Sequence, residues 1–518
     1  MSHVDFNDDR VVVIVGSGAG GATIANELCQ RGIRCVLLEA GPRFTLADFS
    51  HDELAMAAKL TWPDAPEVTS PEPLSASKPY VCKGVGGTTL HWSGIALRLS
   101  ASERRARQIY GAVTGSTLAD WPVLDREFDA YYSRAEARLG VTGTHGNPLL
   151  PGNNNFKVLY HGARSLGYRD ISTGTMAINS RTRDGRPGCI QMGFCLQGCK
   201  IGAKWSTLYT EIPRAEETGR LDLRTGCTVL RIEHDVKGRA SGVVYVDGSG
   251  QTLRQRAHAV CIAANAVESA RLLLNSASQT FPDGLGNSSG LVGCNYMTHN
   301  HVFVMGQMPK PVHAYRGTVQ AGLVGDERPH RPERGFAGGY MLEQISFGLP
   351  FATLALQNGK WGAQLARFIE GYANLAGLVV LGEELPQEAN RVTLSRTRLD
   401  AHGMPIASIH RRQHANDQQM MTHAVERASA LYRAVGAEQI FVAESTGTTH
   451  NMGTARMSAR ASNGVVNGWG QAHDVPNLFV SDGSQFVTSG AANPTLTIVA
   501  LAIRQGEYIA RQLKARTL

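Results

Sequence analysis

The feature that most constrains the fold is a buried-strand pattern that leads directly into a glycine-rich turn and a helix. Residues 10–15 (RVVVIV) suit a strand covered on both faces, and residues 19–31 follow with helical periodicity. Residues 35–39 (CVLLE) form a second apolar run. Because strand–helix–strand crossovers are right-handed and place the two strands in parallel, we expect the chain to begin as a doubly wound α/β fold.

The turn after the first strand has the spacing of a dinucleotide-binding motif. Gly16, Gly18 and Gly21 fill the pattern G-x-G-x-x-G. The first glycine permits a tight turn, the second lets a pyrophosphate approach the backbone, and the third allows close helix packing. Glu39 ends the second strand, where a carboxylate can accept hydrogen bonds from ribose hydroxyls. The motif predicts a bound dinucleotide, and the alternative is a glycine-rich structural turn.

Composition and charge exclude several classes of protein. Hydrophobic residues make up 42% and charged residues 18% of the 518 residues, which excludes a disordered or fibrous chain. The net charge of +7 includes no run of five or more basic residues, so we expect no nucleic-acid partner. No apolar stretch reaches the roughly 18–20 residues that cross a bilayer, and no basic segment followed by an apolar one opens the chain. We therefore expect neither a direct membrane span nor export by a signal of its own.

The rest of the chain shows two kinds of pattern. Strand-like runs at residues 221–229, 240–246 and 257–263, with a helix at 267–275, resume the nucleotide-binding pattern. Residues 301–440 instead combine short strands (301–305, 391–394 and 406–410) with a helix at 415–435. This indicates an antiparallel sheet with helices in a separate substrate-facing domain. Residues 494–513 form a closing amphipathic helix.

A second glycine cluster occupies residues 84–94 (GVGGTTLHWSG). Gly86 and Gly87 allow the backbone to lie flat against a planar ring, and Thr88 or Thr89 can hydrogen-bond near the reactive nitrogen of a flavin. The alternative is a loop packed under the first domain. This segment alone does not name a cofactor.

A third motif lies near the C-terminus, at residues 450–454 (HNMGT) and 481–495 (SDGSQFVTSGAANPT). Together with the N-terminal unit and GGTTLHW, this block resembles the glucose-methanol-choline (GMC) oxidoreductases, over about residues 10–509. The resemblance implies FAD as the cofactor. It places His450 at the family's catalytic histidine and Asn493 at the position of a second His or Asn. Further FAD contacts are implied at Asp482, Gly483, Pro494 and Thr495.

The resemblance also implies an α/β architecture with a discontinuous, Rossmann-like FAD-binding domain and an α+β, antiparallel-sheet substrate domain. We assign residues 1–100, 205–300 and 445–518 to the FAD-binding domain. Residues 101–204 and 301–444, including a Cys-rich loop at 189–199, are assigned to substrate-binding or cap regions. Val229 is placed to meet adenine through its backbone, or is ordinary packing.

The chemistry of alcohol oxidation agrees with these roles. Removing hydride from carbon toward flavin N5 requires removal of the hydroxyl proton, and a neutral imidazole such as His450 suits that task. The amide of Asn493 can hold the same oxygen without titrating. We interpret a nearby polar cluster, which includes His299 and His301, as structural hydrogen bonding.

His91 in GGTTLHW lies where some members of the resembled family carry a histidine bonded to the flavin 8α carbon. The resemblance therefore implies either covalent attachment of FAD through His91 or a histidine that is only hydrogen-bonded beside it. Retention of yellow colour in acid-precipitated protein separates the two.

Cys189, Cys195 and Cys199 form a close group among nine cysteines. Their spacing, with glycines between them, can direct three thiolates at one centre, as a 3Fe-4S cluster requires. It resembles the spacing in membrane-linked bacterial sugar dehydrogenases of the GMC family, in which such a cluster passes electrons to a cytochrome. The alternatives are a structural zinc with a fourth ligand elsewhere and three thiols that bind no metal.

These observations predict FAD-dependent oxidation of an alcohol, such as a sugar or polyol hydroxyl, with electrons passed to a cytochrome or quinone rather than oxygen. The alternative enzyme is a pyranose-oxidase-like oxidase that produces hydrogen peroxide. A silent flavoprotein subunit has no use for His450 and Asn493, and an NAD-dependent dehydrogenase shares only the first motif. The expected location is cytoplasmic, or periplasmic and membrane-associated if a small, chaperone-like, signal-bearing subunit carries the folded chain.

Overall fold

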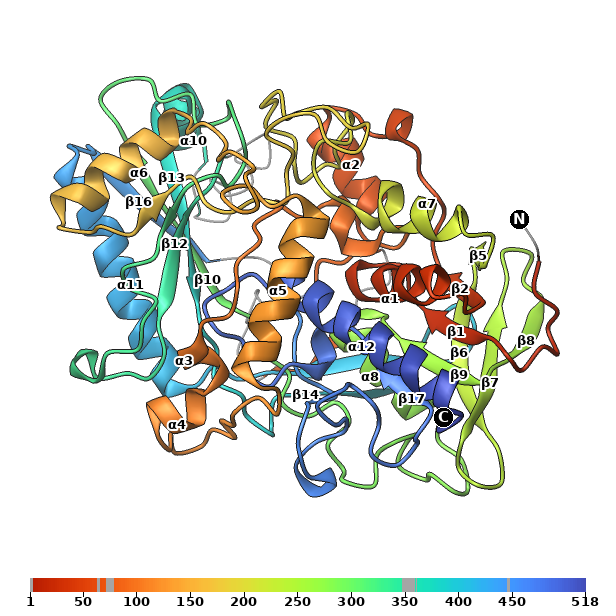
Figure 1. The fold of residues 1–518 in the computed structure, drawn as a ribbon. Coiled ribbons are helices and arrows are strands. Elements are labelled where there is room, and N and C mark those ends of the chain that lie inside the picture. Colours follow the sequence, from red (N-terminus) through yellow and green to blue (C-terminus); the bar gives the residue numbers. More distant parts are fainter. Residues whose placement is uncertain (1–2, 63–65, 71–78, 347–358, 360, 445–447) are drawn as a thin grey trace.

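The computed structural model describes residues 3–62, 66–70, 79–346, 359, 361–444 and 448–518. Two large sheets dominate this part of the chain, one parallel and one antiparallel (Figure 1). The predicted α/β class with an antiparallel second sheet is confirmed. The predicted boundary at residue 445 lies outside the described residues.

The parallel sheet is the nucleotide-binding pattern predicted from the N-terminus. Strand β1 (Val12–Val15) pairs in parallel with β2 (Cys35–Glu39), with Val12 opposite Cys35. Every residue of both strands is buried. The strand order is β17 (Leu478–Val480), β9 (Ala259–Ile262), β1, β2, β5 (Leu221–Thr225). Helices α1 (Ala19–Gln30) and α12 (Thr495–Ala515) pack against each other beside this sheet.

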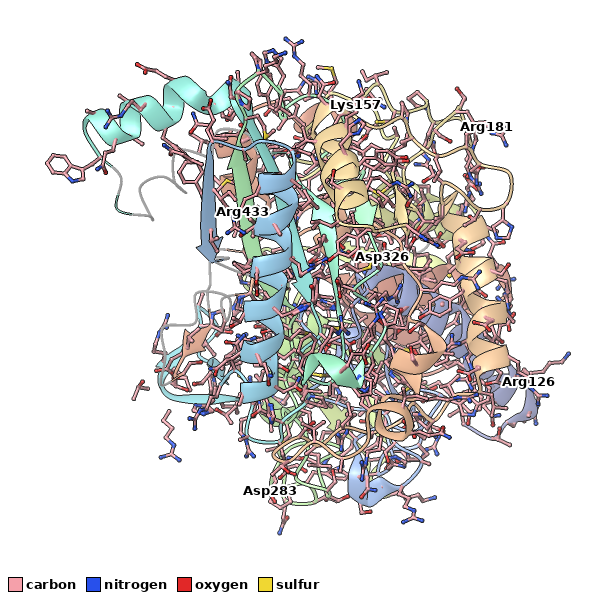
Figure 2. The ribbon with its side chains drawn as sticks, turned by 90° about the vertical axis from the view of Figure 1, so that its left-hand side faces the viewer. Arg126, Lys157, Arg181, Asp283, Asp326 and Arg433 are labelled. Atoms are coloured by element: carbon pink, nitrogen blue, oxygen red, sulfur yellow. The ribbon has the colours of Figure 1, made fainter. Side chains whose placement is uncertain are left out.

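The antiparallel sheet lies on the opposite side of the molecule from the parallel one (Figure 1). Its strand order is β16 (Gln439–Glu444), β10 (Asn300–Gln307), β13 (Leu375–Gly382), β12 (Tyr340–Gln344), β11 (Leu323–Val324), β4 (Ile171–Ser172). Helices α11 (Ala415–Ala434) and α6 (Asn154–Ser165) pack on one face of it. Figure 2 shows α11 running alongside these strands, with Arg433 in its last turn. The other face is therefore free to line a cavity.

Two smaller sheets and shorter helices complete the described fold. The smaller sheets are β14 (Arg391–Leu399), β15 (Pro405–His410), β3 (Glu67–Val68) and β6 (Thr228–His234), β7 (Ala240–Val246), β8 (Thr252–Arg256). The remaining helices are α2 (Glu53–Leu60), α3 (Ala101–Arg104), α4 (Ala106–Tyr110), α5 (Asp125–Leu139), α7 (Glu211–Glu216), α8 (Asn265–Asn275) and α10 (Ala363–Glu370).

The structure corrects two details of the predicted pattern. The single strand predicted at residues 221–229 is wrong, because the chain turns at Gly226, whose φ is +66°, and continues as β6 in a different sheet. The strands at 391–394 and 406–410 exist, but they pair with each other outside the six-stranded sheet. Among the described helices, none combines the length and apolar character needed to span a membrane.

Candidate active site

A cavity of about 930 Å³ runs from the carboxyl ends of β1 and β2 to strands β10, β12 and β13. In a doubly wound sheet this edge is where a ligand binds. The predicted residues that line the cavity come from both chain ends: Gly16, Gly18, Glu39, Gly87, Thr88, Thr89, His91, Val229, His450, Asp482, Gly483, Asn493, Pro494 and Thr495. Gly21, Gly86 and the three clustered cysteines are not among the lining residues, although Leu196 and Gln197 beside Cys195 are.

The first glycine turn forms a cradle at the nucleotide end. A Cβ atom at Gly21 would lie 1.9 Å from the carbonyl oxygen of Gly16, so only glycine permits this approach of helix to strand. A Cβ at Gly18 would meet nothing within 4 Å. Gly18 is also the N-cap of α1 and supplies no side-chain cap. Backbone N–H groups at the start of this helix are therefore available to an anionic pyrophosphate.

Glu39 is held rigidly beside this cradle. One carboxylate oxygen accepts hydrogen bonds from the Ser17 N–H at 3.0 Å and the Ser17 hydroxyl at 2.6 Å, and the other accepts from the Gly41 N–H at 3.0 Å. Burial raises the pKa of Glu39, while these hydrogen bonds oppose the increase. Ser17 also accepts a hydrogen bond from the Gly86 N–H at 3.1 Å, so it joins the two glycine motifs. Sequence reasoning missed Ser17 because it fills a variable position of the motif.

The second glycine motif lies directly against the first. Gly87 has φ of +51°, and a Cβ there would lie 2.9 Å from the Gly18 Cα. The Thr89 hydroxyl donates to the Gly86 carbonyl at 2.5 Å and lies 2.9 Å from the Ser206 hydroxyl. Because Thr89 is engaged inside the protein, Thr88 is the better candidate to contact a ligand.

His91 follows this motif and faces the cavity without a polar partner. It is 1% exposed, and neither ring nitrogen has a hydrogen-bond partner among the described residues. Its ring centroid lies 4.5 Å from that of Tyr80. Burial, with a smaller contribution from Lys204, lowers the pKa of His91 to about 3, so the imidazole is neutral and one ring nitrogen carries a lone pair.

Asp482 is fixed at the N-terminal end of a short 3-10 turn (Gly483–Gln485). Its carboxylate accepts hydrogen bonds from the Ser269 hydroxyl at 2.5 Å and the Ser484 N–H at 2.9 Å. A Cβ at Gly483 would lie 2.5 Å from the Asn451 carbonyl oxygen. Asp482 is thus fixed by its hydrogen bonds and Gly483 by its close approach to Asn451, and both residues line the cavity.

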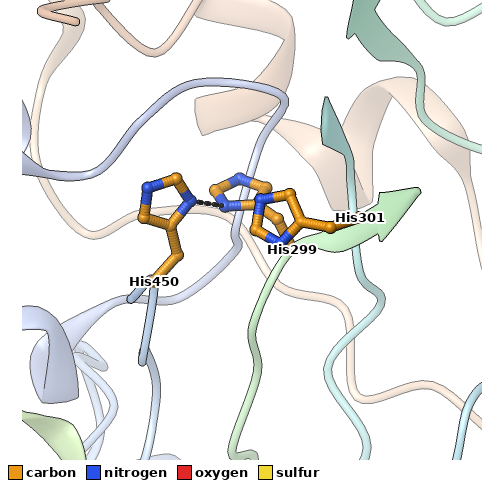
Figure 3. Close-up of side chains that lie close together, drawn as sticks. All are labelled: His299, His301 and His450. Carbon is orange, nitrogen blue, oxygen red and sulfur yellow. Dashed lines mark hydrogen bonds between the residues drawn. The ribbon is translucent and has the colours of Figure 1, made fainter. Parts of the chain in front are cut away.

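His450 lies at the other end of the cavity and forms a hydrogen-bonded chain with His299 (Figure 3). The Nδ1 atoms of the two rings are 2.9 Å apart, and His299 Nε2 is 2.8 Å from the Gly490 carbonyl oxygen. A carbonyl only accepts, so His299 Nε2 carries a proton and His299 Nδ1 carries a lone pair. His450 must then donate from Nδ1. This assignment leaves a lone pair on His450 Nε2, as a general base requires.

Burial keeps this histidine cluster neutral. It lowers the pKa of His450 well below its usual range, with further lowering by His299 and His301. The pKa values of His299 and His301 fall to about 4 and about 3 for the same reason. In the described part of the chain, these are the three residues whose possible metal-ligating atoms all lie within 4.8 Å of one another. A hydrogen bond joins two of them, His299 and His450.

The Cys-rich loop lies against the segment that carries His91. Lys204 is 1% exposed, and its ammonium donates to the carbonyl oxygens of Leu90 at 2.9 Å, Trp92 at 2.6 Å and Cys195 at 2.5 Å. Burial lowers its pKa to about 8. No carboxylate among the described residues lies within ion-pair distance of Lys204. A buried cation without an anionic partner favours a negatively charged group nearby.

Two of the three clustered sulfurs accept a backbone hydrogen bond. The N–H of Gln191 donates to Cys189 Sγ at 3.3 Å, and the N–H of Lys204 donates to Cys199 Sγ at 3.4 Å. Burial raises the pKa of the Cys195 thiol. Across the described residues, the three cysteines do not form a group with ligand atoms all within 4.8 Å, as a single zinc ion would need. In a cuboidal cluster each thiolate binds a separate iron, which permits wider spacing.

The glycine cradle at one end of the cavity and the imidazole at the other define a dinucleotide-dependent oxidoreductase. Comparison with known families agrees. Residues 3–301 match the N-terminal model and residues 386–502 the C-terminal model of the GMC oxidoreductases. The chain therefore belongs to the GMC oxidoreductase family, whose members bind FAD. The open space at Gly18 and the unpartnered nitrogens of His91 fit that cofactor.

Individual relatives extend over nearly the whole chain. A 2-methyl-1,2-propanediol dehydrogenase of Mycolicibacterium austroafricanum is 34% identical, covering 98% of this chain and 96% of the relative. The fructose dehydrogenase large subunit of Gluconobacter japonicus is 28% identical, covering 99% and 100%. Among solved structures, pyridoxine 4-oxidase from Mesorbium loti has a TM-score of 0.68 at 17% identity, covering 96% of this chain and 99% of that chain. This last likeness shows a shared fold.

Proposed function

We propose that this chain oxidises a CH–OH group of a sugar or polyol, with His450 as the general base and Asn493 as the residue that holds the substrate oxygen. The observation that carries the proposal is the hydrogen-bonded chain from the Gly490 carbonyl through His299 to His450, from which a free Nε2 lone pair on His450 follows. Asn493 lines the same cavity, and its amide N–H group can donate a hydrogen bond to the substrate oxygen.

FAD, when bound, supplies the flavin ring whose N5 accepts a hydride. The protein supplies the proton chemistry: His450 Nε2 takes the hydroxyl proton while the carbon that bears this hydroxyl loses a hydride, which leaves a carbonyl group. The Nδ1–H bond to His299 holds the ring in this orientation. Asn493 fixes the alcohol oxygen without a change of charge. Apolar cavity walls, such as Val379 and Ile345, exclude water from this end.

The decisive experiment is anaerobic reduction of the flavin by substrate. His450→Ala should slow this half-reaction by roughly 10²–10⁴, the scale of a lost general base. His423→Ala is the matched control, because His423 hydrogen-bonds Tyr340 at 3.0 Å and does not line the cavity. A rate for the His450 variant within threefold of wild type, with FAD retained, contradicts the assignment.

We further propose that electrons leave through a 3Fe-4S cluster on Cys189, Cys195 and Cys199 to a cytochrome or quinone, with a small subunit as an additional partner. The two N–H···S bonds and the buried Lys204 cation suit an anionic thiolate cluster. Lys204 also connects this loop to the His91 segment, so a cluster held by these cysteines would lie near the cavity wall.

Iron and acid-labile sulfide analysis of anaerobically purified protein tests this second proposal. Cys195→Ser should lose both elements, whereas Cys294→Ser, at a buried cysteine outside the loop, should keep them. Protein without iron that produces hydrogen peroxide in step with substrate oxidation would instead establish the oxidase alternative.

A further inference from the structure

One buried acid in the cavity wall has no role in the chemistry described above. Glu343, in the middle of β12, is 1% exposed and lines the cavity. Its Oε1 atom has no hydrogen-bond partner among the described residues. Its Oε2 atom accepts one hydrogen bond, from the Gln320 amide at 3.3 Å. The second oxygen is therefore available to a ligand.

Among the described residues, some buried acids have an arginine partner, whereas Glu343 has none. Glu384 receives hydrogen bonds from Arg411 at 2.7 and 2.9 Å, and Glu103 forms an ion pair with Arg328 at 2.5 Å. No cation in the described part of the chain lies within ion-pair distance of Glu343. Because an unpaired buried carboxylate is costly, burial raises the pKa of Glu343 to about 8, although interaction with the Asn493 amide opposes the change. Burial therefore favours the neutral, protonated form of this group.

The sheet register places this acid in the substrate end of the cavity. Phe303 of β10 lies opposite Val379 of β13, and Val379 lies opposite Glu343 of β12. All three side chains line the cavity. Glu343 is thus a polar group set in an apolar row of the sheet. It is also next to Asn493, the residue proposed to hold the reacting oxygen.

We propose that Glu343 binds a second hydroxyl group of the substrate, close to the hydroxyl that is oxidised, and so selects diols and polyols over simple alcohols. This inference rests on the proposed function. A carboxylic acid both donates and accepts a hydrogen bond, which matches a hydroxyl group. An anionic substrate group would need a cation that this wall does not provide. Because Glu343 and Asn493 line the same cavity, we expect the two hydroxyls to be on nearby carbons of the substrate.

The test compares substrates of equal length that differ only at the remote end: 1,3-propanediol, 1-propanol and 3-amino-1-propanol, with ethylene glycol and ethanol as a shorter pair. Wild-type holoenzyme should show kcat/KM at least about tenfold higher for each diol than for its simple alcohol, since leaving a buried polar group unpaired is unfavourable. This comparison requires no variant.

Three variants locate the effect. Glu343→Leu should reduce the preference for the diol by roughly 10- to 100-fold. Glu343→Gln, which keeps a neutral hydrogen-bonding group, should retain most of it. Met341→Leu is the matched control, because Met341 is on the same strand but outside the cavity lining. A merely structural role would lower kcat/KM for diol and simple alcohol alike.

The failing outcomes are distinct. A wild-type enzyme that oxidises diols and simple alcohols equally well overturns this inference and leaves the proposed function intact. So does an unchanged preference in Glu343→Leu. Selection of the amino alcohol, abolished in Glu343→Gln, would show that the acid binds a cation instead. Failure of every alcohol to reduce the flavin overturns the proposed function itself.

Discussion

His299 offers the sharpest test of how the protein prepares its base. Its Nδ1 atom accepts the hydrogen bond from His450, and its Nε2–H group donates to the Gly490 carbonyl oxygen. His299→Leu removes the acceptor, so the Nδ1–H group of His450 is left buried without a partner. The alternative tautomer of His450, with the proton on Nε2, then becomes more populated, and that tautomer cannot accept the substrate proton.

The expected loss follows from the cost of an unpaired buried donor. This cost is about 1–3 kcal/mol, and each 1.4 kcal/mol corresponds to about tenfold in rate. His299→Leu should therefore slow flavin reduction by roughly 5- to 150-fold. His299→Asn should lose less, because its amide oxygen can replace Nδ1 as the acceptor. Substrate binding should change little, since His299 is not among the residues that line the cavity.

Stopped-flow reduction of the flavin under anaerobic conditions measures this loss directly. A deuterated C–H bond on the substrate should slow the reaction in wild type and variant, which identifies the step as hydrogen removal from carbon. FAD absorbance checks that each variant is loaded, and His423→Leu controls for loss of a histidine outside the cavity. If fully loaded His299→Leu reduces its flavin within twofold of the wild-type rate, His299 does not set the tautomer of the base.

Three further outcomes follow from the same geometry. The pKa values of about 3 for His91 and about 4 for His299 lie below the ordinary value of 6.5. Below pH 6.5 the unfolded chain therefore binds protons on these histidines that the folded chain excludes. The melting temperature should fall as pH decreases from about 6.5 toward 4. An unchanged melting temperature over this range would refute the buried, neutral state of the two histidines. Wild-type protein precipitated with acid should stay yellow if His91 bonds FAD covalently, and the His91→Ala protein should then release its FAD. Release of FAD from both proteins would limit His91 to a non-covalent contact. Gly20→Ala should prevent folding or FAD binding, because its Cβ would lie 1.5 Å from the Ser481 carbonyl oxygen; a loaded, active Gly20→Ala protein would show that helix α1 can shift.

Local patterns were sufficient to predict much of the fold. The buried runs and glycine spacing gave β1, α1 and β2, and the helix predicted at residues 415–435 is α11 (Ala415–Ala434) within one residue. The prediction of strands failed where contacts with distant parts of the chain decide which sheet a strand joins. Apolar content continues across Gly226, but the positive φ there sends the chain into a second sheet. Nothing in the periodicity of residues 221–229 distinguishes one strand from two.

The candidate site divides in the same way. The glycines of the cradle were predictable because each acts through its own backbone. At Gly21, for example, an added Cβ would lie 1.9 Å from the Gly16 carbonyl oxygen. Glu343 was not predicted, although an acid inside the apolar run YMLEQ is a usable signal, because its environment comes from strands far away in the sequence. His299 was interpreted as structural hydrogen bonding, and its bonds are of that kind. The effect of His299 on the lone pair of His450 can be inferred only when both hydrogen-bond partners of His299, His450 and the Gly490 carbonyl, are known.

The base at the centre of the proposed chemistry therefore depends on three separated parts of the chain. His299 begins the approach to β10, His450 precedes the last strand of the parallel sheet, and Gly490 precedes α12. If any of these segments moves, the Gly490 carbonyl no longer fixes the proton of His299, and His450 loses the acceptor that orients it. A correctly oriented base thus exists only when the antiparallel sheet and the nucleotide-binding sheet are assembled around one cavity. Since proton removal and dinucleotide binding draw on the same C-terminal segments, residues 482–495 couple the two ends of the site.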